Sequence, residues 1–346
     1  MILSPFGKIY GAVANARNRL YERGFFRSYD LGAKTVSIGN ITVGGTGKTP
    51  LAAFVAGTFF EAGEKVCILT RGYGRRDPRR RVLVSDGERV LTDARTAGDE
   101  PFELARKLSG KAVIVADADR VSAAEWAMEK FGPTVFVLDD AFQHRRVRRD
   151  LDIVCIDATD PFGNRQVLPA GVLREPLENL RRAGAVVIPR ASLAGDIEAL
   201  KNELGKYANC PVFVSHNEFS GFTKLEDFHK NLDFEPHKLS TQYSALHTLP
   251  SLAFCALGNP RNFFEQLRGE NFRVAAECSF PDHHVYAPKD IAALEAKARA
   301  TGAEILLTTA KDAVKLGGLK TEIPVFIAEN RIIFENRKDF VNYLLS

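Results

Sequence analysis

With 346 residues, the chain is too long for one average domain, and its length suits two domains that each bury a core. Hydrophobic residues make up 45% and charged residues 26%, which is ordinary for a folded protein and excludes long disordered stretches. The net charge is only +4, but the basic residues occur in clusters, so local charge matters more than the total.

The five cysteines are scattered and form neither a CxxC pair nor a metal-binding spacing, so we expect buried thiols in a reducing cytoplasm. No apolar run reaches the ~18 residues that suggest a membrane-spanning helix. The first residues also lack the apolar centre and small-residue cleavage site of a signal peptide, so we expect neither a span nor a leader.

Residues 1 to about 30 are predicted to form an amphipathic helix with cationic flanks. Apolar residues recur at steps of three and four, and Lys8, Arg17, Arg19 and Arg23 are interleaved with them. Phe25 and Phe26 follow, so the segment has the composition of an element that lies in a membrane surface. A helix that covers the protein's own core would show the same periodicity, and the pattern alone does not separate the two.

A phosphate-binding loop is predicted between a short strand, Val36 to Ile38, and a helical pattern that starts at Leu51. Such a loop closes backbone N–H groups on phosphates, while its lysine bridges phosphate oxygens and its threonine hydroxyl can ligate Mg²⁺. Thr42 stands where the general motif has glycine, and Val43 stands where one ATPase subgroup has a second signature lysine. The predicted nucleotide-binding residues are Thr42, Val43, Gly44, Gly45, Thr46, Gly47, Lys48 and Thr49.

Arginines follow the next predicted strand, Lys65 to Thr70, on the glycine-rich loop that begins with Arg71. The carboxyl end of a parallel strand is where α/β sheets bind ligands, so these arginines suit an anionic substrate. A solvated basic loop is the alternative interpretation. Further on, Asp99 stands at the start of a predicted helical segment. Aspartate is common at helix starts, so the residue pattern alone favours a helix-start role for it.

A second half of a nucleotide site is predicted at the strand Thr134 to Leu138, which ends in Asp139 and Asp140. A carboxylate at this place can bind Mg²⁺ or a metal-bound water. A long loop with the adjacent pair Arg174 and Glu175 comes later, and loops of this length are commonly functional.

Strands rich in β-branched residues alternate with helical patterns, which predicts a parallel sheet with helices on both faces. The predicted fold is therefore α/β: a P-loop NTPase-like domain and a smaller C-terminal α/β domain. The expected organisation is an N-terminal helix (1–30), the P-loop domain (31–215), a linker or β-ribbon (216–248) and the smaller domain (249–346). His283 and His284 beside Asp282 do not make a metal site by spacing, and a surface role or an acid–base role is expected instead.

Several segments together, in this order, resemble the tetraacyldisaccharide 4′-kinase family of lipid A synthesis. They are GNITVGGTGKTP, LTRGYGRR, AGDEP, LDDAFQH, LPAGVLREPL, LGNP, FPDHHVY and TTAKDAVKL, and they span residues 36 to about 316. Each segment alone is weak evidence for the family, but the whole set in this order is highly specific. The amphipathic N-terminus also resembles the membrane-contacting region of that family, which favours the membrane interpretation of residues 1–30.

The resemblance implies transfer of the γ-phosphate of ATP, with Mg²⁺, to the 4′-hydroxyl of an acylated disaccharide 1-phosphate at the cytoplasmic face of the inner membrane of a Gram-negative bacterium. It implies that Asp99 is the general base, that His283 tunes it and that Lys48 acts on the phosphates. The implied metal ligands are Thr49, Asp139 and Glu175, and the implied substrate contacts are Arg71, Asp140 and Arg174.

Two other classes of ATPase remain open on the residues alone. A nucleotide-switch ATPase that acts on a protein partner also uses a GGxGKT loop, although Val43 argues against its dimerising form. A nucleic-acid-dependent ATPase would use the arginine clusters, but these lack interleaved aromatic residues apart from Tyr73, so no nucleic-acid partner is expected. Whether the protein has protein partners is left open by the sequence.

Overall fold

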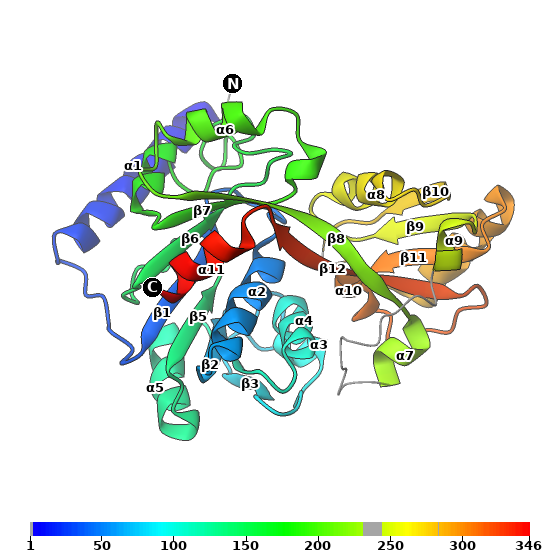
Figure 1. The fold of residues 1–346 in the computed structure, drawn as a ribbon, viewed down its shortest axis with the longest axis horizontal. Coiled ribbons are helices and arrows are strands. Elements are labelled where there is room, and N and C mark those ends of the chain that lie inside the picture. Colours follow the sequence, from blue (N-terminus) through cyan, green and yellow to red (C-terminus); the bar gives the residue numbers. More distant parts are fainter. Residues whose placement is uncertain (1–2, 231–243, 283) are drawn as a thin grey trace.

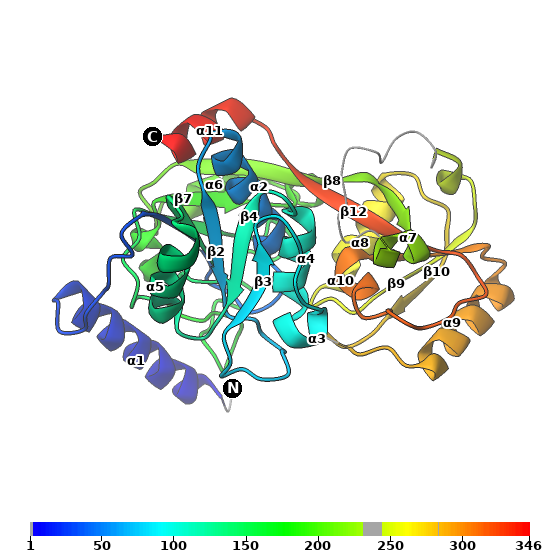
Figure 2. The same cartoon turned by 90° about the horizontal axis from the view of Figure 1, so that it is seen from below.

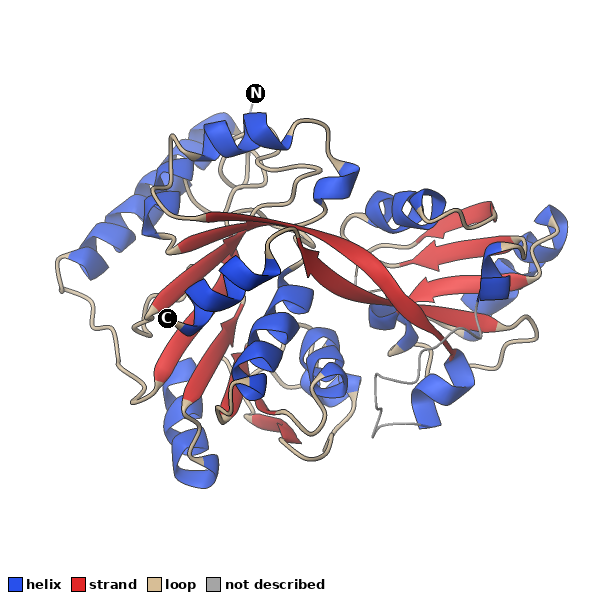
Figure 3. Cartoon of the chain, viewed as in Figure 1, coloured by secondary structure: helices blue, strands red, loops and turns tan. Residues whose placement is uncertain are grey.

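The computed structural model describes residues 3–230, 244–282 and 284–346. In this part of the chain, twelve strands form one continuous sheet in the order β10-β9-β11-β12-β8-β7-β6-β1-β5-β2-β4-β3. Neighbouring strands are parallel except for the pairs β3–β4 and β8–β12. A mostly parallel sheet with helices on its faces confirms the predicted α/β fold (Figure 3).

The first unit contains the strands β1 (Lys34–Asn40), β2 (Val66–Thr70), β3 (Val82–Asp86), β4 (Ala112–Ala116), β5 (Val135–Asp139), β6 (Leu151–Cys155) and β7 (Ala185–Ile188). Its helices are α1 (Ser4–Glu22), α2 (Lys48–Glu61), α3 (Ala94–Ala97), α4 (Asp99–Lys107), α5 (Arg120–Phe131) and α6 (Ile197–Leu204), with the 3-10 helices η1 (Leu177–Arg182) and η2 (Ala191–Leu193). One face of this sheet packs on α2 and α4, and the other packs on α5, η1 and α6. Both faces are therefore buried, as the apolar strands require.

The second unit contains the strands β9 (Ser251–Cys255), β10 (Val274–Ser279) and β11 (Ile305–Thr309). Its helices are α7 (Leu225–Lys230), α8 (Pro260–Gly269), α9 (Pro288–Thr301) and α10 (Ala310–Ala313), with the 3-10 helix η4 (Ser244–His247). Two apolar clusters, one on each face, fill its core.

A ribbon of two long antiparallel strands, β8 (Val212–Lys224) and β12 (Val325–Phe334), joins the two units (Figure 1). Near its start β8 pairs with β7, and along its remaining length it pairs with β12 from Ser215 to Lys224. The predicted linker or β-ribbon, residues 216–248, therefore starts inside β8, and part of it lies outside the described residues.

The last helix, α11 (Arg337–Leu345), lies on the first unit, although the predicted smaller domain ran to residue 346. Phe340 and Leu344 are buried in the same core as Leu51 and Val55 of α2. The rings of Phe334 and Phe340 stack at 4.2 Å. The prediction missed this return because an apolar stripe on a helix shows that the helix packs, but not on which core.

Candidate active site

The predicted phosphate loop lies at the end of β1 and leads directly into α2, which begins at Lys48. Gly47 has a φ of 83°, a conformation that side chains rarely adopt, and this turn directs the chain into the helix. The amide of Asn40, the last residue of β1, donates to Thr42 O at 2.7 Å and to Thr46 Oγ1 at 2.9 Å. The loop is thus held open by a side chain from its own strand.

The acidic pair predicted at the end of β5 lies beside this loop. Asp139 is only 2% exposed; Thr70 Oγ1 donates to its Oδ2 at 3.2 Å, while Oδ1 accepts no hydrogen bond within the described residues. Burial, with the nearby charges of Glu100 and Asp140, raises the pKa of Asp139 to about 7. An orphaned, buried carboxylate oxygen of this kind is a natural ligand for a cation.

Asp140 connects the phosphate loop with the later Arg174–Glu175 loop. Lys48 Nζ lies 3.6 Å from Asp140 Oδ1, and Arg174 Nη1 donates to both carboxylate oxygens at 2.9 and 3.0 Å. Burial acts to raise the pKa of Asp140, but Lys48 and Arg174 lower it further, so the net pKa is below its ordinary value. Arg174 N also donates to Ile41 O at 2.7 Å, which fixes the two loops side by side.

Glu175 is held by four hydrogen bonds that leave its carboxylate well satisfied. Arg182 donates to both oxygens at 3.0 Å, Asn18 Nδ2 donates to Oε2 at 2.9 Å, and Gln143 Nε2 donates to Oε1 at 3.0 Å. The carboxylate is 2% exposed and ties α1 and η1 to the site. These contacts favour a structural role for Glu175 over the predicted metal ligation.

Asp99 is the first residue of α4, and its side chain faces the second unit. Its Oδ2 lies 3.1 Å from Lys315 Nζ, and only 17% and 6% of the two side chains are exposed. Gly98, which precedes it, has a φ of 96° and lies so close to the arginine loop that an added Cβ would sit 2.7 Å from Tyr73 O. His283, the predicted partner of Asp99, lies outside the described residues.

The arginine loop divides into structural and exposed members. Arg75 is buried and donates to Ala116 O at 2.5 Å and Pro78 O at 2.7 Å, and Arg81 pairs with Asp117 at 2.8 Å. Arg71, the predicted substrate contact, is exposed. The sequence interpretation did not single out Arg120, which is 3% exposed and donates from Nη2 to Asp139 O at 3.5 Å; burial lowers its pKa to about 10.

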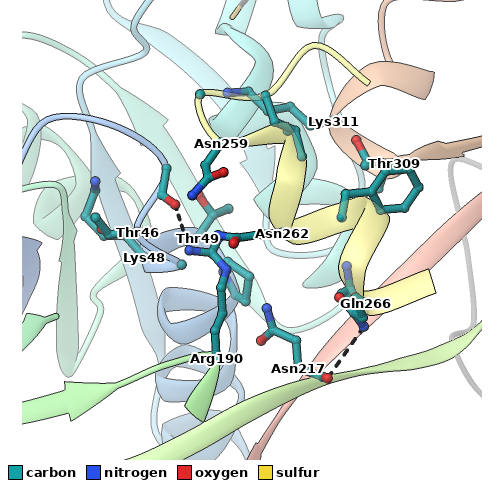
Figure 4. A pocket seen from close by; sticks show the side chains of 18 of the residues that line it. Thr46, Lys48, Thr49, Arg190, Asn217, Asn259, Asn262, Gln266, Thr309 and Lys311 are labelled. Carbon is teal, nitrogen blue, oxygen red and sulfur yellow. Dashed lines mark hydrogen bonds between the residues drawn. The ribbon is translucent and has the colours of Figure 1, made fainter. Parts of the chain in front are cut away.

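A pocket opens between the phosphate loop and the second unit (Figure 4). The loop residues Gly44 to Pro50 line one side, and Asn259, Asn262 and Lys311 of the second unit line the other. The ribbon adds Asn217 and Asn330, and the segment after β7 adds Arg190. The two sides approach closely, since a Cβ added at Gly258 would lie 3.4 Å from Gly45 N.

Sequence reasoning missed the part of this pocket that follows β7 and the part formed by the ribbon. Asn259 of the LGNP segment stands directly before α8, and its side chain makes no capping hydrogen bond but lines the pocket. Arg190 follows the strand β7, and its place at the carboxyl end of a parallel strand was the one available signal.

Comparison with known proteins identifies the family. All residues from 1 to 346 match the model of a family described as tetraacyldisaccharide-1-P 4′-kinase, LpxK. The chain belongs to the tetraacyldisaccharide 4′-kinase family. It is 38% identical over 327 residues to a tetraacyldisaccharide 4′-kinase of Geobacter metallireducens, with coverage of 94% of this chain and 91% of that protein. A tetraacyldisaccharide 4′-kinase of Desulfatibacillum aliphaticivorans is 37% identical over 346 residues, covering 100% and 92%.

A solved tetraacyldisaccharide 4′-kinase structure also matches. It is described as the "apo" form of LpxK from Aquifex aeolicus in complex with ATP, and it matches with a TM-score of 0.77 and 31% sequence identity. The match covers 99% of this chain and 97% of that one. The family resemblance predicted from the ordered motifs is therefore confirmed.

Proposed function

We propose that this protein is an ATP-dependent lipid kinase that phosphorylates the 4′-hydroxyl of a tetraacyldisaccharide 1-phosphate. The observation that carries the proposal is the convergence of Lys48, Asp139 and Asp140 beside a pocket lined by both units, in a chain that belongs to this kinase family throughout its length. ATP is the phosphoryl donor, as the ATP complex of the Aquifex aeolicus relative supports.

The backbone N–H groups from Gly44 to Thr49 and the positive end of α2 would receive the phosphates. Lys48 would leave its 3.6 Å contact with Asp140 or share it with the γ-phosphate, and its charge would offset negative charge that spreads over the transferring group. The protein takes little covalent part in this reaction, so positioning and electrostatic stabilisation provide most of the catalysis.

Mg²⁺ is the metal that such a reaction needs, and the donor set fits it. The free oxygen of Asp139 and the hydroxyl of Thr49 are hard oxygen donors of the kind that Mg²⁺ prefers. No group of three or more His, Cys, Asp or Glu that could hold a metal occurs in the described ranges. Mg²⁺ in nucleotide sites is usually bound through one or two carboxylates together with phosphates and waters. When bound, the ion would neutralise phosphate charge.

Asp99 is the residue we assign as general base for the sugar hydroxyl. Its ion pair with Lys315 keeps a carboxylate oriented at the rim of the pocket, next to Glu100, which lines it. His283 keeps its proposed role as the group that tunes this base. Arg71 and Arg174 are proposed to bind the anionic substrate, with Asp140 holding Arg174 in place.

The helix α1 is proposed to lie on the membrane surface. It packs on the first unit through Gly7 and Gly11, since a Cβ at Gly7 would lie 2.8 Å from Val167 O. Several large apolar side chains in its first half face away from the protein: Phe6 is 58% exposed, and Ile9 and Val13 are each 63% exposed. A helix that covered its own core would bury these residues, so the packing favours membrane contact over the alternative.

Figure 2 shows α1 on the side of the first unit away from the second unit, and in this proposal the membrane surface would lie against that side. No described helix is both long and apolar enough to cross a bilayer. The exposed apolar side chains of α1 lead us to propose peripheral attachment at the cytoplasmic face of the inner membrane, where an acylated substrate and cytoplasmic ATP meet.

The test is transfer of ³²P from ATP to the disaccharide 1-phosphate in mixed micelles. Lys48→Met and Asp99→Asn should each lower the turnover by at least about a hundredfold, whereas the exposed Lys320→Met serves as a matched control and should keep it. Near-full turnover in Lys48→Met or Asp99→Asn would contradict the assigned roles. ATP hydrolysis that depends on a protein partner, without any lipid product, would support the nucleotide-switch alternative.

A further inference from the structure

Arg190 lies where the phosphate loop meets the end of β7, and none of the roles above uses it. It lines the same pocket as Gly44 to Thr49, and Figure 4 shows it beside Lys48, Thr49 and Asn262. The residue has a left-handed backbone, with φ 60° and ψ 30°. A residue other than glycine, asparagine or aspartate in this conformation is uncommon, and such residues concentrate at ligand sites.

The segment that carries Arg190 is fixed to the phosphate loop at two points. Arg190 Nη1 donates to Gly45 O at 2.9 Å. Pro189 packs on Gly47, where an added Cβ would lie 3.3 Å from the Pro189 Cβ. The end of β7 therefore supports the phosphate loop at Gly45 and Gly47.

A buried carboxylate holds the guanidinium in one orientation. Arg190 Nη1 also pairs with Asp157 Oδ2, and the other oxygen of Asp157 accepts from Thr159 N at 3.1 Å and from Thr159 Oγ1 at 2.8 Å. Asp157 follows β6 and is 6% exposed, so it is itself fixed. A guanidinium that is oriented in advance loses little side-chain entropy when a ligand binds.

Within the described part of the chain, the hydrogen bonds of the Arg190 side chain come from Nη1. The Nε and Nη2 groups stay available on a side chain that is 16% exposed toward the pocket. Two other cationic side chains that line the pocket pair with carboxylates through their ammonium groups. Lys107 pairs with Glu103 at 2.8 Å, and Lys311 pairs with Asp282 at 3.2 Å. Planar N–H donors beside a phosphate loop match the oxygens of a polyphosphate.

We propose that Arg190 is a nucleotide-binding residue that donates Nε and Nη2 to phosphate oxygens of ATP, alongside Lys48. Asp157 positions its guanidinium, and the bond to Gly45 O couples its position to that of the loop. This inference rests on the proposed use of ATP, but it concerns the phosphates alone and not the lipid acceptor.

The experiment measures the affinity of the full-length protein for ATP, ADP, AMP and adenosine by calorimetry, without lipid. Arg190→Gln should weaken ATP binding by at least about tenfold, the scale of one charge-assisted hydrogen bond, and should leave adenosine binding nearly unchanged. Arg190→Lys should recover part of the ATP affinity, because lysine keeps the positive charge but lacks the planar guanidinium with its paired N–H donors. Arg261→Gln is the matched control: Arg261 is on α8, is 82% exposed and lies outside the pocket lining.

Two results would overturn the inference. Unchanged ATP affinity in Arg190→Gln would show that the residue makes no contact with the nucleotide. An equal loss for ATP and adenosine would show that Arg190 only supports the loop or contacts the nucleoside. If the wild-type protein itself bound no ATP, the assigned kinase activity would fail instead, so the two failures are distinguishable.

Discussion

Replacement of Asp139 by asparagine should stabilise the ligand-free protein at high pH. The carboxyl group has a pKa of about 7 in the folded protein and an ordinary value of 3.8. Between these values the folded state holds a proton that the unfolded state has released, so the contribution of this group to stability is present below pH 3.8 and is lost as the pH rises through about 7. The difference corresponds to at most about 4 kcal/mol.

Asparagine resembles the protonated carboxyl in shape and carries no charge at any pH. The free energies of unfolding of wild type and Asp139→Asn should therefore be similar below about pH 4, and the variant should be the more stable by up to about 4 kcal/mol at pH 8. Urea titrations followed by the fluorescence of Trp126 measure this, since it is the one tryptophan of the chain and lies on α5 of the first unit. Mg²⁺ should recover the lost stability in the wild type at pH 8, and not in the variant.

Asp30→Asn is the control, because Asp30 is a solvated carboxylate with 67% of its side chain exposed. Its unfolding free energy should follow that of the wild type at every pH. Parallel curves for wild type and Asp139→Asn from pH 5 to pH 8 would refute the reasoning, since Asp139 would then not hold a proton in the folded state.

Three further outcomes are expected. Gly7→Ala should destabilise the protein by about 1–3 kcal/mol in thermal or urea unfolding, because the added Cβ would lie 2.8 Å from a backbone oxygen. Gly57→Ala is the control: its Cβ would meet nothing within 4 Å, and it should stabilise the protein by up to about 1 kcal/mol. A change of the same sign in both variants would contradict the packing of α1. Lys315→Met should lower kcat by about tenfold or more with little change in the KM for ATP, because Asp99 loses the cation that orients it; a change confined to KM would count against this role. Ile9→Asp should reduce cosedimentation with anionic lipid vesicles while the fold stays intact by circular dichroism; undiminished binding would exclude α1 as the contact.

The first half of the site could be predicted because its signals are local. The strand, the glycine turn and the helix of the phosphate loop follow each other within the span from β1 to α2, and Asp139 ends the strand that pairs with β1. In a parallel sheet, the carboxyl ends of such strands meet at one edge. The proximity of Lys48 and Asp140, at 3.6 Å, follows from this geometry.

The fate of Glu175 could not be predicted, because its partners come from distant parts of the chain. Asn18 is 157 positions away, and Arg182 lies on a 3-10 helix that the sequence pattern did not indicate. A single sequence shows which residues carry charge, but not which opposite charge they meet. For the same reason, the pairing of Asp99 with Lys315 of the other unit was not predicted.

Arg190 shows a different limit of what could be predicted from the sequence. Its position after a buried strand was visible in the sequence, but the pocket that it lines needs the second unit and the ribbon, which approach the loop only in three dimensions. Asp139 could be predicted because an acidic pair closes its strand, whereas Arg190 belongs to no motif that marks it as a site residue.

The ribbon of β8 and β12 has a consequence for how this protein can be dissected. The chain leaves the first unit along one strand and comes back along its immediate neighbour, with Ser215 opposite Phe334. The whole second unit is thus an insertion whose two ends touch. A tight hairpin that replaces the intervening residues would close the excised gap without moving either end, and it would deliver α11 to its place on α2. Such a shortened protein would keep the phosphate loop and lack the part of the pocket lining that the second unit contributes.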